Sequence, residues 1–578
     1  MSQEVSLSIV GSGGDGAVAA GDIMAMACAS QGLHVMKTEA YGPQIRGGES
    51  SCTVRISSVP VFAQAGALDA LVVFSWGDFA RFRDEINAGS ECIIFHDAAD
   101  VAPADLPGIL IPVSFADLMK EADAPGSKNI IAIGLLSSLF GLPLEPIRDA
   151  VRKRFAKKAS NVIDSNLRAF DLGLSLTFPA SVPPRLLTYA KSTPRLLMSG
   201  NEASAYGALH AGCSFFAGYP ITPSTEILQL LSQWLPKTGG TCVQTEDELA
   251  AIGAVIGGSF AGAKSMTATS GPGLALMAEM IGLASIAEIP AVIVDVQRGG
   301  PSTGIPTKNE QSDLLHAVFA SHGDTPRAVL APTDVEDAFH LTVDAFNIAE
   351  EFQVPVIVLS DQLIGQRRET IEVASLEHEV IDRRPAIVDD DYKRYRETSD
   401  GVSPMTVPGI TGGMYQTNGL EHDETGRPSS MFAVHEKMNA KRHRKLNAIA
   451  HKYPLFRTFG RNNPDLGILC WGSAFGPVRE ALDALNSGDL RVAAFVPRII
   501  APLPVEQMQS FVDSCERVLV IELSYAAQFH QYLRSQIDLP RAKTTVYARS
   551  GGKPLAVSEV ISTVRQLLGA QTLEETLV

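Results

Sequence analysis

The stretch Gly218-Tyr219-Pro220-Ile221-Thr222-Pro223-Ser224-Thr225-Glu226 decides how the middle of this chain folds. A mostly apolar run over 213–216 precedes it, and an amphipathic run over 227–234 follows it. The two prolines fix φ twice and hold Thr222 at a rigid turn. Ser224 or Thr225 can cap the following helix. The pattern predicts a strand, a stiff turn and a helix, the kind of place where ligands bind in a parallel sheet. An ordinary proline-punctuated loop is the alternative.

Length and composition indicate a soluble, multidomain protein. At 578 residues the chain predicts three to four domains. Its 45% hydrophobic and 19% charged residues are typical of globular proteins. Apolar runs such as 130–140 are too short to span a bilayer, and the first residues do not form a secretory signal. We expect a cytoplasmic protein.

The net charge of −16 argues against nucleic acid as a main partner, because phosphate binding needs a positive surface. It also disfavours an acidic protein partner that docks broadly on this chain. The seven cysteines are scattered without a C-x-x-C pair, which excludes ferredoxin-type cluster ligation within the chain. No residue is predicted to bind a metal, so any iron–sulfur cluster belongs to another chain.

The first domain is predicted over 1–180. A buried strand, Val5 to Val10, leads into Gly11-Ser12-Gly13-Gly14-Asp15-Gly16 and a helix. Glycines at this place let backbone N–H groups approach a phosphate at the helix start. The G-x-G-x-x-G spacing leaves a nicotinamide or flavin site open, although Glu39, the candidate ribose-binding acid, lies in an apparent loop. A G-D-G diphosphate and Mg²⁺ motif is rejected, because 40–48 contain no Asn.

Further strands over 71–74, 92–95 and 109–113 alternate with helices and predict a largely parallel sheet. Arg46-Gly47-Gly48-Glu49 places a cation in a flexible loop, which suits a phosphorylated ligand or, equally, a solvated loop. The proline-rich segment 175–194 is predicted to be the linker.

The second domain is predicted over 195–375, with a new sheet beginning at 195–198. Three further strands end in Glu246-Asp247-Glu248, Ser270-Gly271-Pro272-Gly273 and Gln297-Arg298-Gly299-Gly300. Taken singly, acids at a helix start are explained by the helix dipole. Together with Thr222, however, these loops converge on one edge of a parallel sheet. The convergence favours a ligand site containing Thr222, Glu248, Ser270 and Arg298.

The remaining sequence divides at about residue 462. Residues 376–462 are loop-rich and end in a basic helix, which indicates either a connector lying over a partner surface or a free linker. A last α/β domain is predicted over 463–578, with strands at 466–470, 492–496, 518–522 and 545–547.

The motifs Tyr219–Pro223, Glu246–Glu248, Thr269–Gly273 and Gln297–Gly304 resemble the α subunit of 2-oxoacid:ferredoxin oxidoreductases. The first domain is similar to that family's γ domain, fused here ahead of α. The last domain resembles the carboxyl-terminal domain of transketolase-like enzymes. The implied fold class is α/β: a Rossmann-like γ domain, a thiamine-diphosphate-enzyme pyrimidine-binding domain and a transketolase C-terminal-like domain.

The resemblance implies thiamine diphosphate shared with a separate β subunit. That subunit would carry Mg²⁺ and a 4Fe-4S cluster, in an (αβ)₂ heterotetramer. Coenzyme A would be the co-substrate and ferredoxin the electron acceptor, docking mainly on β because this chain is acidic. The preferred substrate is 2-oxoglutarate, from the fusion and the loop 306–311; pyruvate or a branched-chain 2-oxoacid stays open. An NAD(P)-dependent dehydrogenase and a non-catalytic scaffold subunit are the alternative functions.

The resemblance also assigns roles to residues. Glu248, chosen over Glu246, would hydrogen-bond the aminopyrimidine and favour its imino form, which removes the thiazolium proton. Thr222 would donate to the substrate, and Arg298 would pair with its carboxylate. The remaining cofactor-binding candidates are Tyr219, Pro220, Ile221, Ser270 and Gly271 in the second domain, and Gly11, Gly13, Gly14, Gly16 and Arg46 in the first.

Overall fold

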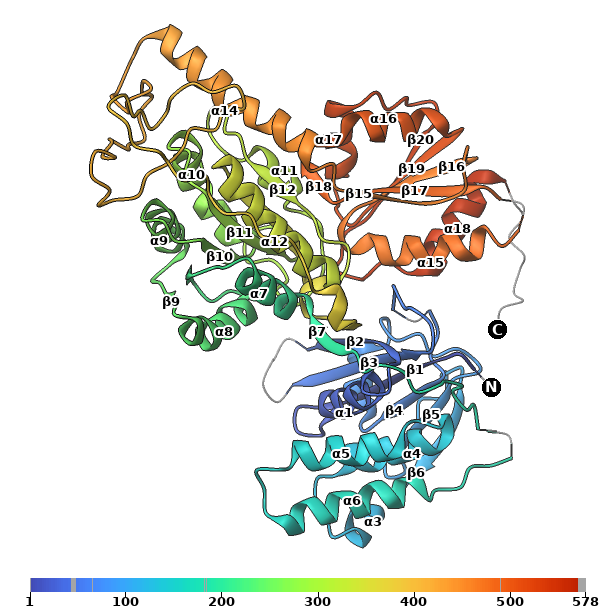
Figure 1. The fold of residues 1–578 in the computed structure, drawn as a ribbon. Coiled ribbons are helices and arrows are strands. Elements are labelled where there is room, and N and C mark those ends of the chain that lie inside the picture. The colour runs from blue at the N-terminus through green and yellow to red at the C-terminus, as the bar shows by residue number, and fades with distance from the viewer. Residues whose placement is uncertain are drawn as a thin grey trace. The chain divides into compact units, whose positions relative to one another are not determined.

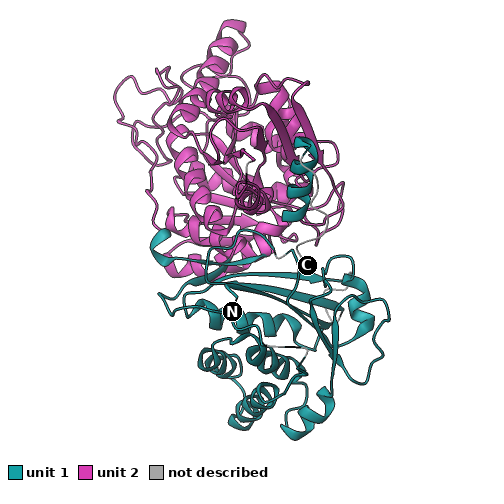
Figure 2. Cartoon of the chain, turned by 90° about the vertical axis from the view of Figure 1, so that its right-hand side faces the viewer, with its two compact units in different colours: residues 1–198, 367–375, 556–578 teal, residues 199–366, 376–555 magenta. Residues whose placement is uncertain are grey.

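The computed structural model describes residues 2–42, 48–64, 66–180, 182, 184–488 and 490–569. The chain forms two compact units (Figure 2). The first comprises residues 1–198, 367–375 and 556–578, and the second comprises residues 199–366 and 376–555. Within the described ranges, no helix is both long enough and apolar enough to cross a membrane.

The described residues of the first unit form an eight-stranded sheet in the order β6-β5-β4-β1-β3-β2-β14-β7. Strands β1, β4 and β5 are almost continuously buried because each has a neighbouring strand on both sides. The strands are β1 (Glu4–Ser12), β2 (His34–Tyr41), β3 (Glu49–Ser57), β4 (Ala70–Val73), β5 (Ile93–Asp97), β6 (Ile109–Val113), β7 (Leu196–Ser199) and β14 (Arg368–Ile371). The helices are α1 (Ala17–Ala29), α2 (Trp76–Phe82), α3 (Phe115–Glu121), α4 (Lys128–Phe140), α5 (Leu144–Arg154), α6 (Ser160–Leu174), α18 (Val557–Leu568) and the short η2 (Val373–Ser375).

This sheet is mixed, whereas the sequence predicted a largely parallel one. Strands β1, β4, β5 and β6 are parallel, but β3 runs antiparallel to both β1 and β2. The predicted loop at Glu39 is part of β2. Likewise, residues 196–199 form the edge strand β7 of this first sheet and do not begin a new one. Polar residues in β2 and β3 conceal these strands, because side chains such as Lys37 are buried through ion pairs.

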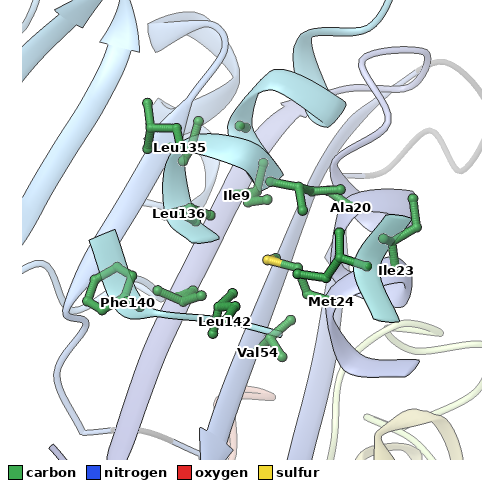
Figure 3. Close-up of a cluster of buried hydrophobic side chains, with 14 of the residues drawn as sticks. Ile9, Ala20, Ile23, Met24, Val54, Leu135, Leu136, Phe140 and Leu142 are labelled. Atoms are coloured by element: carbon green, nitrogen blue, oxygen red, sulfur yellow. The ribbon is translucent and has the colours of Figure 1, made fainter. Parts of the chain in front are cut away.

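Helices α1, α4, α5 and α6 cover one face of this sheet (Figure 1). Figure 3 shows the core beneath them, where Ile23 and Met24 of α1 and Leu135 and Leu136 of α4 meet apolar residues of the sheet such as Ile9.

The second unit contains a seven-stranded sheet in its described residues, ordered β18-β12-β13-β11-β10-β8-β9 and parallel except for β18. Its strands are β8 (Phe215–Gly218), β9 (Thr241–Gln244), β10 (Ser265–Thr269), β11 (Ala291–Gln297), β12 (Ala328–Leu330), β13 (Pro355–Asp361) and β18 (Ile499–Ala501). The helices between them are α7 (Gly200–His210), α8 (Thr225–Trp234), η1 (Leu235–Thr238), α9 (Glu248–Phe260), α10 (Gly271–Ile286), α11 (Leu314–Phe319), α12 (Val335–Phe352) and α13 (Gln362–Gln366). The four predicted strand ends therefore do belong to one parallel sheet.

A second sheet of this unit follows the connector and has the order β15-β17-β16-β19-β20 in the described residues. Its strands are β15 (Phe456–Gly460), β16 (Leu466–Leu469), β17 (Val492–Pro497), β19 (Arg517–Glu522) and β20 (Thr544–Ala548). Its helices are η3 (Gly472–Ala474), α15 (Phe475–Leu485), α16 (Val505–Ser514) and α17 (Gln528–Gln536). Strand β18 follows β17 directly but pairs with β12, so the two sheets share one hydrophobic core.

The connector is packed against its own unit, so the free-linker alternative is wrong. Arg383 forms an ion pair with Glu350 of α12 at 2.7 Å. Helix α14 (Phe432–Lys452) inserts Lys441 and Lys445 beside the fully buried carboxylate of Glu288, at 2.7 and 2.5 Å. The prediction that the connector lies over a partner surface stays a prediction.

Candidate active site

The loop after β8 is held by two side chains from elsewhere in the unit. Asn201 at the start of α7 donates to the carbonyl oxygen of Pro223 at 2.9 Å. Arg298, which follows β11, donates through Nη1 to the carbonyl oxygen of Thr222 at 2.5 Å. Ser224 occupies the N-cap position of α8, but its hydroxyl donates to the carbonyl oxygen of Ile221 and makes no side-chain cap, contrary to the prediction. The structure thus brings Thr222 and Arg298 together through the main chain of Thr222.

Burial separates the two glutamates that follow β9. Glu246 is exposed, whereas Glu248 is only 6% exposed. Asp247 is the N-cap of α9 and accepts from the backbone N–H of Ala250 at 2.8 Å. This cap fixes Glu248 at the first position of the helix. Among the described residues, no hydrogen bond or ion pair joins the Glu248 carboxylate to another side chain or to the backbone.

The turn between β10 and α10 provides the surface against which Glu248 lies. A Cβ atom built on Gly273 would stand 2.7 Å from Cγ and 2.8 Å from Oε1 of Glu248. It would also stand 2.0 Å from Oγ1 of Thr269. Ser270 is the N-cap of α10, and its fully buried hydroxyl has no hydrogen-bond partner. Glycine at 273 is therefore required for the close approach of Glu248.

Arg298 lies beside two carboxyl groups that the sequence did not single out, Asp295 on β11 and Asp313 before α11. Burial lowers the pKa of Arg298, and both carboxylates oppose this. Burial raises the pKa of Asp295 well above its ordinary value, and the charge of Asp313 raises it further. Burial also raises the pKa of Asp313, to about 7, although Arg298 acts in the opposite direction. In the sequence, only an acid within the apolar strand β11, three residues before Arg298, could have indicated Asp295, and no local signal indicates Asp313.

The loop 306–311, from which 2-oxoglutarate was preferred, binds the last domain. Asn309 donates to the hydroxyl of Ser473 at 3.2 Å. Gln311 donates to the carbonyl oxygen of Trp471 at 2.8 Å and accepts from the backbone N–H of Leu523 at 2.9 Å. The loop therefore connects the neighbourhood of Arg298 to the last domain. These contacts explain its buried polar residues without a substrate.

In the first unit, the glycine-rich turn follows β1 as predicted. Gly16 is the N-cap of α1 with φ of 77°, a backbone conformation that favours glycine. The Asp15 carboxylate accepts from both the backbone N–H and the hydroxyl of Ser12 at 2.9 Å. Gly11 and Gly13 lie on either side of Ser12, and a Cβ on Gly14 would meet nothing within 4 Å. Arg46 lies outside the described residues, so its predicted role is a prediction only.

The residues around Glu248 fit a bound aminopyrimidine. A buried carboxylate without a partner is costly, and a ring nitrogen that donates or shares a proton would satisfy it. Gly273 lets that carboxylate pack directly against the turn between β10 and α10, where any Cβ would displace it. In the described part of the chain, no group of three or more His, Cys, Asp or Glu residues is arranged to hold a metal ion.

Three family models match the chain in order. The model of the pyruvate ferredoxin/flavodoxin oxidoreductase domain matches residues 6–176. The thiamine-diphosphate-binding model of pyruvate flavodoxin/ferredoxin oxidoreductase matches 206–441, and core domain II of pyruvate:ferredoxin oxidoreductase matches 464–560. The second match contains every predicted site residue of the second domain.

Curated proteins and a solved structure agree with these models. The 2-oxoacid:ferredoxin oxidoreductase subunit alpha of a Sulfolobus species is 31% identical over 91% of each chain. The 2-oxoglutarate synthase subunit KorA of Methanothermobacter marburgensis is 37% identical over 64% of this chain and 99% of its own. The 2-oxoglutarate:ferredoxin oxidoreductase of Magnetococcus marinus, solved with 2-oxoglutarate, coenzyme A and succinyl-CoA bound, is 37% identical, with a TM-score of 0.92, and covers 98% of this chain and 100% of its own. The chain belongs to the 2-oxoacid:ferredoxin oxidoreductase family, and the predicted fold class is confirmed.

Proposed function

We propose that this chain is the α subunit, with a γ-type domain fused ahead of it, of a 2-oxoglutarate:ferredoxin oxidoreductase. The enzyme converts 2-oxoglutarate and coenzyme A to succinyl-CoA and CO₂ and passes two electrons to ferredoxin, or catalyses the reverse carboxylation. The observation that carries the proposal is the 37% identity over 98% of the chain to the Magnetococcus enzyme solved with these reactants. The 2-oxoglutarate synthase subunits of archaea support the same substrate.

Thiamine diphosphate, when bound, supplies the electron sink that decarboxylation of a 2-oxoacid requires. Glu248 would hold the pyrimidine through a hydrogen bond to a ring nitrogen. Its burial and its lack of a protein partner support this role, because a charge-assisted hydrogen bond in a dry site is strong. Ser270, Gly271 and the loop Tyr219-Pro220-Ile221 would line the same cofactor. Mg²⁺ and the 4Fe-4S cluster are proposed to bind the partner β subunit.

Arg298 would bind the carboxylate next to the keto group of the substrate. Its Nη1 is engaged by Thr222, but its buried Nε has no partner, which leaves a donor for a planar carboxylate. Thr222 would donate its hydroxyl to the substrate. Both roles depend on the short contact between these two residues, which fixes the guanidinium against the loop.

Gly11, Gly13, Gly14, Gly16 and Arg46 of the first unit would contact the phosphates of coenzyme A. The uncapped start of α1 supports this, since helix N-termini favour phosphate. We place the enzyme in the cytoplasm as an (αβ)₂ heterotetramer. Ferredoxin would dock mainly on β, because this chain carries a net charge of −16.

The test is viologen reduction by the natively purified complex with coenzyme A and a panel of 2-oxoacids. We expect activity that requires coenzyme A and is highest with 2-oxoglutarate. A maximum with pyruvate or a branched-chain acid would refute the substrate assignment. No activity with any 2-oxoacid, from a complex that contains its cluster-bearing partner, would favour the scaffold alternative.

Glu246 provides a matched control for Glu248. Glu248→Gln should lower turnover at least about 100-fold, as expected when a catalytic proton transfer is lost. Glu246→Gln, an identical change two residues away on the exposed side, should leave turnover unchanged. Thiamine diphosphate affinity, measured by isothermal titration, should fall only for Glu248→Gln. Equal effects of the two substitutions would remove Glu248 from the mechanism.

A further inference from the structure

Buried polar atoms without partners gather around the end of β11. They are Oγ of Ser270, both carboxylate oxygens of Asp295, Oδ2 of Asp313 and Nε of Arg298. Ser270 and Asp295 are fully buried, and Arg298 is 6% exposed. Buried polar groups in folded proteins nearly always have partners, so such a concentration needs an explanation. These atoms do not hold the loops in place, because none of them makes a hydrogen bond to a loop, so loop positioning does not explain why they are buried.

Asp313 is placed accurately in this group. Its backbone N–H donates to Oε1 of Gln297 at 3.0 Å, at the end of β11. Its carboxyl group lies against the Ser270 turn, where a Cβ on Gly271 would stand 2.6 Å from Oδ2. No ion pair joins Arg298 to Asp295 or Asp313 in the described residues. The guanidinium therefore remains available, although two acids lie within its field.

The charges that surround this group come from several elements. Arg298 is the cation, and Asp295 and Asp313 are the acids whose charges act on it. Glu310 faces Asp313 from the preceding loop and accepts from the backbone N–H of Gly551. Glu248 of α9 lies against Gly273 in the same turn, and it is not among the acids that act on Arg298 or Asp313. With Asp295, Asp313 and Glu310 all ionised, one arginine would stand among three negative charges, which is unfavourable for binding an anion.

We propose that Asp295 and Asp313 form a buried acid pair that holds a proton beside Arg298, so that a 2-oxoacid carboxylate binds with proton uptake by the pair. The inference rests on the proposed function, which places that carboxylate on Arg298. The proton comes from solvent and stays on a carboxyl group; no bond in the substrate changes. The raised pKa values of both acids support this arrangement. Once the pair is fully ionised, it competes with the substrate for the field of Arg298, and affinity falls.

The test is calorimetric titration of the complete complex with 2-hydroxyglutarate, which carries both carboxylates but cannot be decarboxylated as a 2-oxoacid. Titrations in buffers of different ionisation enthalpy count the protons that binding takes up. We expect uptake of up to about one proton near neutral pH. Affinity should fall by up to about tenfold per pH unit above the pKa of Asp313.

Asp313→Asn removes the titrating group and keeps its shape. This variant should bind 2-hydroxyglutarate without proton uptake and retain at about pH 8.5 the affinity it has at about pH 6. Asp295→Asn is the second variant if the first does not assemble, and the wild-type measurement requires neither. The proposal is overturned if the wild-type complex binds with no proton uptake and pH-independent affinity, or if both variants take up protons as the wild type does. Normal 2-oxoglutarate turnover in those cases leaves the proposed function intact, whereas absence of turnover and binding overturns both.

Discussion

Replacing Glu288, which follows α10, by glutamine should destabilise the packing of the connector more than removal of any single charge within α14 itself. The Glu288 carboxylate is fully buried and contacts Lys441 at 2.7 Å and Lys445 at 2.5 Å, both also buried. Its backbone oxygen accepts from Arg394 of the connector at 2.7 Å. Glutamine keeps the shape and removes the charge that compensates two ammonium groups.

The magnitude follows from the cost of keeping a lysine neutral. Burial already lowers the pKa of Lys445 to about 7, with Glu288 acting against the shift. Without Glu288 the two buried ammonium groups have no compensating carboxylate, so at least one lysine must lose its proton. Lowering a pKa from about 10.4 to 7 costs about 4 to 5 kcal/mol. Removing one member of a buried ion pair costs about 3 to 5 kcal/mol. We therefore expect Glu288→Gln to lose about 3 to 5 kcal/mol of local stability.

Native-state proteolysis within 376–431 measures this loss, because cleavage tracks the free energy of local opening when reclosing is fast. A loss of about 3 to 5 kcal/mol corresponds to cleavage of the variant by thermolysin about 150- to 4,000-fold faster. Glu424→Gln is the control: it removes the partner of Lys437 on the same helix, where both side chains are partly exposed, at 48% and 26%. That change should cost at most about 1 kcal/mol.

The pH dependence provides a further check. In Glu288→Gln the folded lysines have pKa values below those of the unfolded chain. The unfolded state then binds more protons above neutral pH, so stability rises with pH and the deficit shrinks toward pH 10. In the wild type, the pKa of Glu288 is lowered, so its contribution is present above its ordinary value and is lost in acid. The reasoning would be refuted if the variant were cleaved within about fivefold of the wild-type rate. It would also be refuted if the stability difference between variant and wild type stayed constant up to pH 10.

Three further predictions concern the site. Gly273→Ala should abolish most turnover and weaken thiamine diphosphate binding, because its Cβ would displace Glu248. The control is Gly282→Ala on the same helix, where a Cβ would meet nothing within 4 Å, and it should retain both. Equal activities of the two variants would contradict the proposed placement of Glu248 against the cofactor. Gln311→Ala should lower stability by about 2 to 4 kcal/mol, because the carbonyl of Trp471 and the N–H of Leu523 lose their partner. It should also raise KM for the 2-oxoacid. An unchanged melting temperature would show that the loop 306–311 does not hold the last domain. Asp313→Asn should stabilise the protein at pH 8 but not at pH 4, since a raised carboxyl pKa makes the folded state lose stability as pH rises between its ordinary value and about 7; calorimetric melts at both pH values decide this.

The sequence predicted elements where one physical signal dominates. Continuous apolar runs identified β1, β5 and β11, and glycine or proline after them located the loops of the site. The choice of Glu248 over Glu246 came from the family motif; the structure adds the burial of the one and the exposure of the other.

What was missed depends on contacts that are distant in sequence. Strand β2 was not predicted because Lys37 reads as a solvent-exposed residue. The structure shows that Lys37 is buried and paired with Asp22 of α1. Glu288 and Lys441 are charged residues in unremarkable positions, and only the fold buries them together. Asp313 gains its unusual pKa from burial against Gly271, which no local pattern encodes.

The edge of the eight-stranded sheet has a consequence for synthesis of the chain on the ribosome. Strand β14 pairs with β2, and Thr370 accepts from the backbone N–H of Val35 at 2.9 Å. Between β7 and β14 the ribosome must add roughly 170 residues. At about 5 to 20 residues per second, the amino-terminal sheet waits roughly 10 to 30 s with β2 as an open edge. An open edge is a template for wrong pairing. We therefore expect the amino-terminal sheet to need protection of that edge during synthesis, and a version ended before residue 367 to keep the edge of β2 open permanently.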